Sequence, residues 1–157
     1  MTNLHLDRNE MNAGLFVSLH DVTIKKILCQ RNGFTLVLED GFCVVKAGIV
    51  FHPVNCRVKV SGVHCNDYNC RVVYGKPSAR GEMCWSYPIS LRELATFLKE
   101  QDTVVQLYQE KYDVEGLLWR ANLPCIDDIG GNLWRHIVIE SHEIPKIEYF
   151  GVIETQE

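Results

Sequence analysis

Long hydrophobic runs are absent from this chain of 157 residues. The apolar stretches, such as residues 48–51, are only a few residues long, whereas a membrane-spanning helix needs about 20 apolar residues. The first residues also lack the basic-then-apolar order of a secretory signal. We therefore expect a soluble, cytoplasmic protein with no membrane partner.

Compact pairs of metal-binding cysteines are also missing. The seven cysteines leave at least one thiol unpaired in any intramolecular disulfide scheme, and none forms the C-x2-C pair that zinc sites favour. The nearest approach to a metal site is the set Cys56, His64, Cys65 and Cys70, in which the spacing is loose. We expect reduced thiols packed as small hydrophobic side chains, with no cofactor. A zinc-stabilised module built on those four residues is the last-ranked alternative.

The sequence also contains no recognisable catalytic motif. Asp127 and Asp128 lie in a Gly-rich segment and could hold a metal or act as an acid–base pair. Adjacent aspartates in a turn are more often solvated turn formers. Gly130-Gly131 is not followed by the Lys-Ser/Thr of a phosphate-binding loop. The sequence leaves enzymatic activity open and favours a protein without it.

Positive charge is scarce in the second half of the chain. Residues 1–78 hold nine Lys and Arg against six Asp and Glu, a net charge of +3. Residues 79–157 hold seven against fourteen, a net charge of −7, so the whole chain carries −4. An acidic half repels phosphate backbones, so we expect no nucleic-acid partner. The same half suits a basic protein partner.

The features that are present indicate β-structure. The dipeptides Asn32-Gly33 and Asp40-Gly41 favour tight hairpin turns, and they separate three runs rich in β-forming residues. A bulge near Lys25-Lys26 would reconcile the two halves of the first run. The pattern predicts a three-stranded meander made of residues 22–30, 34–38 and 42–47.

One amphipathic helix interrupts the β-pattern. Ser90 and Glu93 form the S-x-x-E capping box, and Leu91, Leu94, Ala95 and Leu98 follow at helical spacing. We predict a mainly β (α+β) fold in one domain spanning residues 1–157. Its form is an antiparallel sandwich or barrel-like sheet of about eight to nine strands, with one main helix near residues 90–100 covering an open end.

The segment formed by residues 19–42 resembles a group of small, mostly uncharacterised bacterial proteins, especially from Gram-positive bacteria. The shared order is Leu19-His20-Asp21, a short β-segment, a turn, an alternating strand and Asp40-Gly41-Phe42. Some related-looking families are grouped with immunity proteins of polymorphic toxin systems. The resemblance covers roughly the first third of the chain. It implies a protein-binding role and transfers no catalytic residues.

The leading hypothesis is therefore a non-enzymatic, cytoplasmic, immunity-like interaction protein. It would bind its partner through a sheet face or through the acidic half of the chain. The sequence repeats a Trp-Arg pair on two expected strands, and if either tryptophan faces outward, that face is the first candidate surface. The candidate binding residues are Trp119, Arg120, Trp134, Arg135, Asp127 and Asp128.

A small-molecule-binding β-barrel or sandwich, or an enzyme with a dispersed site, is the second hypothesis. Its mark would be an enclosed apolar pocket with convergent polar groups. The sequence does not specify the ligand, the partner or the oligomeric state.

Overall fold

The protein is mainly β, and its strands pair antiparallel. A computed structural model describes residues 1–78, 81–114, 116–123 and 134–154, apart from the side chains of 73–78, 81–85 and 134. These residues form thirteen strands, one α-helix and one 3-10 helix. In chain order the elements are β1 (Thr2–Asp7), η1 (Arg8–Glu10), β2 (Leu15–Ser18), β3 (Thr23–Gln30), β4 (Gly33–Leu38), β5 (Cys43–Lys46), β6 (Ile49–Phe51), β7 (Val54–Ser61), β8 (Cys70–Ser78), β9 (Gly81–Ile89), α1 (Leu91–Glu100), β10 (Val105–Asp113), β11 (Gly116–Asn122), β12 (Trp134–Ser141) and β13 (Lys146–Ile153). The predicted fold class is confirmed, with more strands than expected.

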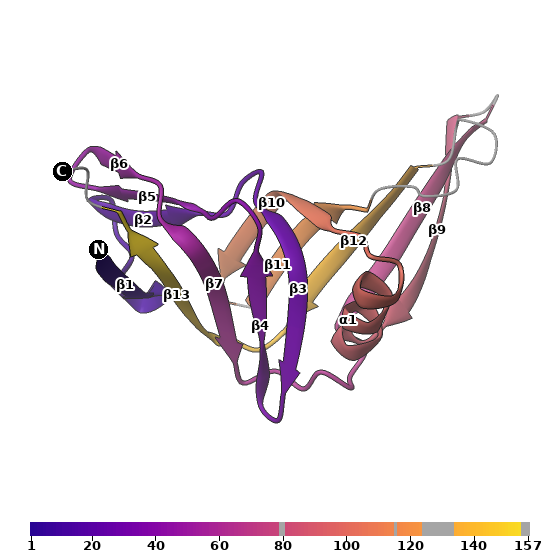
Figure 1. The fold of residues 1–157 in the computed structure, drawn as a ribbon. Coiled ribbons are helices and arrows are strands. Elements are labelled where there is room, and N and C mark those ends of the chain that lie inside the picture. Colours follow the sequence, from indigo (N-terminus) through magenta and orange to yellow (C-terminus); the bar gives the residue numbers. More distant parts are fainter. Residues whose placement is uncertain (79–80, 115, 124–133, 155–157) are drawn as a thin grey trace.

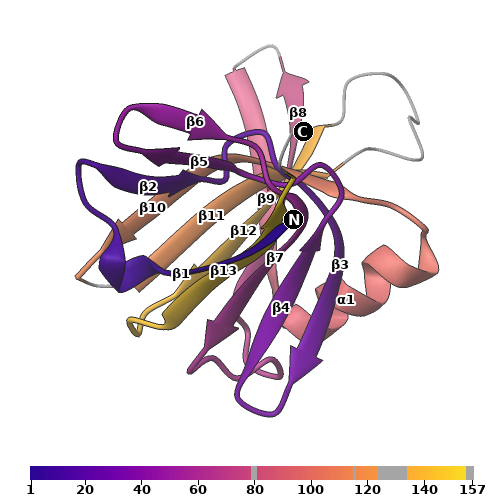
Figure 2. The ribbon, with the colours of Figure 1, turned by 60° about the vertical axis from the view of Figure 1, so that its left-hand side comes forward.

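Two sheets hold these strands. In the described residues the long sheet has the order β1-β13-β7-β4-β3-β10-β11-β12-β8-β9, so that β1 and β9 are its edges. Figure 1 shows this sheet bent into a trough whose two arms meet where β3 lies beside β10. The second sheet, β2-β5-β6, lies at the end of the molecule where β1 and β13 are found (Figures 1 and 2).

The two halves of the sequence are interleaved in the long sheet. Strand β13 lies between β1 and β7, and β12 pairs with β8. The Arg71 guanidinium from the first half lies 3.2 Å from the Glu140 carboxylate of the second. The charge difference between the halves therefore does not correspond to two separate ends of the molecule.

Helix α1 packs against β3, most of which has no ladder partner on the β10 side among the described residues. Its N-cap is Ser90, whose hydroxyl accepts the Glu93 N–H at 3.1 Å, as the capping box predicts. Strand β3 pairs with β10 only at Thr23 and Ile24, and α1 packs against β3. The helix thus covers the part of β3 that β10 leaves unpaired, which agrees with the predicted covering role of this element. Within the described residues, no helix is long and apolar enough to span a membrane.

The first predicted hairpin is confirmed with a shifted loop. Strands β3 and β4 pair from Ile24↔Leu38 to Gln30↔Gly33, with a register shift between Ile24 and Lys26 where the bulge was expected. The two loop residues are 31 and 32, so Gly33 belongs to β4. A side chain at Gly33 would overlap the carbonyl oxygen of Val60 in β7. This glycine serves the close approach of two strands rather than the turn.

The rest of the predicted meander is wrong. Strand β5 pairs with β2 and β6 instead of β4, so the chain changes sheets after Leu38. Gly41 has φ +80°, and a Cβ there would lie 2.5 Å from the carbonyl oxygen of Pro53. The Asp40-Gly41 dipeptide thus forms a bend packed against the Pro53 segment, because its glycine allows this close backbone contact.

Candidate functional site

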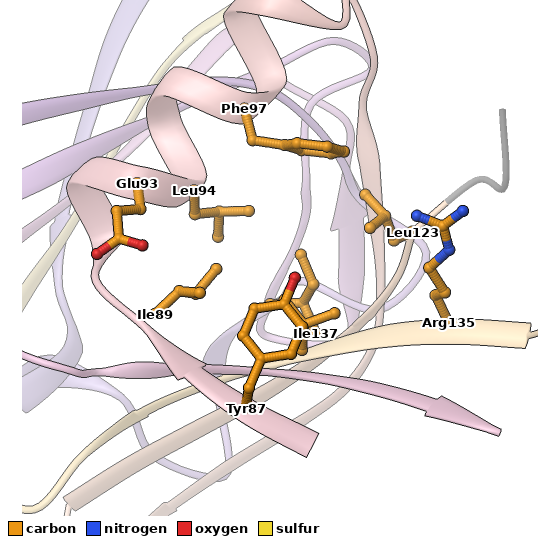
Figure 3. A pocket seen from close by; sticks show the side chains of 9 residues that line it. Tyr87, Ile89, Glu93, Leu94, Phe97, Leu123, Arg135 and Ile137 are labelled. Atoms are coloured by element: carbon orange, nitrogen blue, oxygen red, sulfur yellow. The ribbon is translucent and has the colours of Figure 1, made fainter. Parts of the chain in front are cut away.

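A largely apolar cavity lies between α1 and the strands at one end of the long sheet. Its volume is about 510 Å³, and we call it the α1 pocket. Strands β8, β9 and β12, the helix and the residue after β11 all contribute side chains to it (Figure 3). The lining residues are Val72, Tyr87, Ile89, Glu93, Leu94, Phe97, Leu123, Arg135 and Ile137.

The turn from β9 into α1 positions one wall of this pocket. Ile89 precedes the N-cap and Leu94 occupies the fourth helical position, the spacing of a hydrophobic staple. Both side chains are buried and face the cavity. Phe97 lies one turn further and is only partly buried. The helix therefore presents a wider apolar face than burial against the core alone requires.

Three polar side chains reach the same space. In Figure 3 the Tyr87 hydroxyl points from the sheet toward the helix, while Glu93 and Arg135 lie at opposite ends of the pocket. The Arg135 guanidinium is a permanent cation and can donate several hydrogen bonds. Tyr87 is 46% exposed, so the pocket opens to solvent beside it. This arrangement suits a molecule with an apolar body and polar groups at its ends.

Of the predicted binding residues, Arg135 is the one that the structure places at this pocket. Trp119 is 0% exposed, and its ring meets Phe34 edge-on at a centroid distance of 6.3 Å. Arg120 follows it on the opposite, exposed face of β11. Trp119 and Arg120 therefore face opposite sides of β11 and do not form one surface. Asp127, Asp128 and the side chain of Trp134 lie outside the described residues.

The four metal candidates are not gathered into one site. The Cys56 thiol donates to the Pro53 carbonyl oxygen at 3.3 Å, and the Cys65 thiol donates to the Gly33 carbonyl oxygen at 3.1 Å. Cys70 is fully buried and His64 is exposed. Across the described part of the chain, no three His, Cys, Asp or Glu side chains are placed to hold a metal ion together.

Tyr87, Glu93 and Phe97 were not among the predicted binding residues. Glu93 was assigned only to the capping box. The available signal was Phe97, which lies beside the Leu91, Leu94 and Leu98 stripe and widens it. A broad apolar face on a short helix indicates a second apolar contact besides the core.

The α1 pocket has the size of a typical small-molecule site, about 300–1,000 Å³. A scan against protein-family models gives no match, and searches of the curated proteins and of the solved structures give no significant match. Function therefore has to be inferred from the residues of this chain.

Proposed function

We propose that the protein binds a small, mostly apolar molecule in the α1 pocket. The observation that carries this proposal is the cavity itself, in which six apolar side chains surround the space that Tyr87, Glu93 and Arg135 reach. Apolar contact would provide most of the affinity, and the polar groups would select and orient the ligand. This is the second hypothesis from the sequence, which expected an enclosed apolar pocket with convergent polar groups. The α1 pocket is apolar, but it opens to solvent beside Tyr87, and Glu93 and Arg135 lie at its opposite ends.

Binding of the neutral fluorescent probe N-phenyl-1-naphthylamine tests this proposal. The probe should brighten on entering the pocket, and Phe97→Ser should weaken its binding by about tenfold, because a partly buried aromatic ring is lost from the wall. Phe16→Ser is the matched control, since Phe16 is 42% exposed on β2 and does not line the pocket. Equal loss of binding in both variants, or no binding by the wild-type protein, would contradict the proposal.

The second candidate function is binding of a basic protein partner in the cytoplasm, including an immunity-like role. One observation favours it. Phe16, Val45 and Val50 are cross-strand neighbours on the outer face of the β2-β5-β6 sheet, and Phe16 and Val50 are 42% and 52% exposed. The net charge of −4 favours a basic partner.

A pull-down from the native host at low and high salt tests this second candidate. We expect a basic protein that is retained at low salt, released at high salt, and lost when Phe16→Ser and Val50→Ser are combined. Tyr68→Ser is a control at a 72% exposed aromatic residue outside that sheet. Retention of no partner, or of an acidic one, counts against this function.

A further inference from the structure

Helix α1 has a second recess on its other face. This groove lies between α1 and β3 and has a volume of about 800 Å³. Its floor includes Leu28, Cys29, Ala95 and Leu98. Leu28 is 41% exposed although it is a large apolar side chain in the middle of a strand. The groove shares no lining residue with the α1 pocket, so the two spaces can be tested separately.

Positive charge predominates around this apolar floor. Four cationic side chains line the groove, against the two carboxylates Glu39 and Asp102. The four cationic residues are Lys25, Lys26, Arg92 and Lys99. None of the four forms an ion pair within 4.0 Å among the described residues.

The carboxylates lie at one end of the groove and Arg92 lies at the other. The Glu39 N–H donates to the Thr23 carbonyl oxygen at 2.9 Å, which places Glu39 at the start of β3. Asp102 follows the helix on the way to Val105, which pairs with Ile24 at that same end.

Arg92 is tied to the opposite end of β3. Its backbone N–H donates to the Cys65 carbonyl oxygen at 3.1 Å, and the Cys65 thiol bonds to Gly33, the ladder partner of Gln30. The Arg92 end of the groove therefore has a cation and no lining carboxylate.

A hydrogen bond to Asn66 restrains the Arg92 guanidinium. Its Nε donates to the Asn66 Oδ1 at 2.7 Å, and no hydrogen bond from its terminal amino groups is found among the described residues. Burial and the neighbouring Cys65 thiol raise the pKa of the Cys29 thiol to about 11, and the nearby Arg92 acts in the opposite direction. A fixed guanidinium costs less conformational entropy when it binds an anion than a freely rotating lysine does.

We propose that this groove binds an anionic amphiphile, with a carboxylate, sulfate or phosphate at Arg92 and an aliphatic chain over Leu28 and Ala95. The stems of Lys26 and Lys99 flank the chain, because lysine side chains cover apolar surface while their amino groups stay in water. This site is separate from the α1 pocket and does not depend on the function proposed for that pocket. The occupant is a single amphiphile molecule, not a membrane surface.

Three probes with the same tail test the charge preference. Binding of decanoate, decyltrimethylammonium and decyl maltoside is measured by titration calorimetry, and ¹H–¹⁵N spectra locate the perturbed residues. We expect decanoate to bind at least about tenfold more tightly than the other two, with shifts at Leu28 and Thr96. Equal affinity for the three head groups, or shifts confined to Tyr87 and Leu123, would overturn the proposal.

Substitution of Arg92 tests the position of the head group. Arg92→Gln should weaken decanoate binding by about tenfold, because a charge-assisted hydrogen bond is lost. The variant should stay folded, since Arg92 is exposed and a cation in the first turn of a helix opposes the helix dipole. Arg57→Gln, at an exposed arginine on β7, is the matched control and should bind like the wild type.

Two further probes separate this ligand from macromolecular partners. A hexaglutamate peptide and vesicles of phosphatidylglycerol present the same anionic chemistry without a free single tail. We expect both to bind more weakly than decanoate. Binding of either one without binding of decanoate, or an Arg92→Gln variant that binds decanoate like the wild type, would overturn the proposal.

Discussion

The indole Nε1 of Trp119 donates to the Tyr112 hydroxyl oxygen at 3.1 Å. That hydroxyl in turn donates to the Glu110 Oε1 at 2.9 Å. The Arg8 guanidinium lies 3.3 Å from the centroid of the Tyr112 ring, and its Nη1 donates to the Tyr149 hydroxyl at 3.2 Å. Burial raises the pKa of both tyrosines, so they remain neutral phenols at pH 7. This network joins η1, β10, β11 and β13 at one end of the core.

Removal of the central hydroxyl tests how much this network stabilises the protein. Tyr112→Phe should lower the free energy of unfolding by about 1–3 kcal/mol, because the indole N–H of Trp119 loses its acceptor inside the core. Urea denaturation measures the change. Tyr68→Phe removes a hydroxyl from a 72% exposed residue and should leave the free energy of unfolding nearly unchanged. If both substitutions changed the free energy of unfolding by the same amount, the hydrogen bonds of Tyr112 would not stabilise the protein.

The contact between Arg8 and Tyr149 makes a second prediction. Arg8→Met keeps a long apolar stem but removes the hydrogen bond and the cation over the Tyr112 ring. A double-mutant cycle of Arg8→Met with Tyr149→Phe should give a coupling energy of about 0.5–3 kcal/mol. The pair Arg57→Met and Tyr68→Phe joins residues for which no mutual contact is found among the described residues, and its effects should add. Additive effects at Arg8 and Tyr149 would contradict the prediction.

The helix and the alternating strands were predictable from the sequence because their signals are local. Ser90 and Glu93 form the capping box within one helical turn, and the β3–β4 hairpin joins neighbouring runs. The choice of sheet for β5 was not predictable, since it depends on pairing with β2 and on a backbone contact between Gly41 and Pro53. These contacts join segments that are distant in the sequence, and a local sequence pattern does not predict which distant segments pair.

The site was predicted less well than the fold. Arg135 was selected for its neighbour Trp134, yet its place at the α1 pocket comes from sharing a strand face with Ile137. Trp119 was selected on the condition that it faced outward, but the alternation of β11 directs it into the core. Tyr87 and Phe97 line one pocket only because α1 faces the strand that carries Tyr87. A pocket between two elements depends on how the elements are arranged in space. The periodicity of each element predicts the element but not this arrangement.

The glycine at the start of β4 provides a third test. Gly33→Ala should lower the free energy of unfolding by about 1–3 kcal/mol, because the new methyl group would overlap the Val60 carbonyl oxygen and push β4 from β7. Gly14→Ala is the matched control, since the nearest atom to its added Cβ is the Asn12 Oδ1 at 3.4 Å. Thermal or urea unfolding of the two variants should differ clearly. A stable Gly33→Ala protein would contradict the close approach of the two strands.

The half-buried Cys29 thiol and the buried Cys70 thiol should react slowly with alkylating reagents. Burial raises the pKa of Cys29 to about 11 and raises that of Cys70 further, with the nearby thiols adding to both effects. Because the thiolate is the reactive form, iodoacetamide at pH 8 should label Cys29 and Cys70 far more slowly in the folded protein than in urea. Peptide-resolved mass spectrometry separates the cysteines. Equal labelling rates in both conditions would show that neither thiol is protected.

His136 should make the protein less stable on the acid side of neutrality. Burial lowers its pKa from the ordinary value of 6.5, and the nearby Arg120 lowers it further. Below pH 6.5 the unfolded chain therefore binds more protons at this residue than the folded chain, so the free energy of unfolding decreases as the pH falls from 6.5 toward the folded pKa. Well above pH 6.5 the imidazole is neutral in both states, and this contribution is constant.

The difference in unfolding free energy between the wild type and His136→Gln isolates that contribution. Measured by urea denaturation from pH 8 down to pH 5, the stability of the wild type relative to the variant should decrease below about pH 6.5. His142→Gln, at an exposed histidine after β12, controls for loss of an imidazole at the surface. A wild-type advantage that stays constant or grows as the pH falls would show that the folded protein does not disfavour protonation of His136.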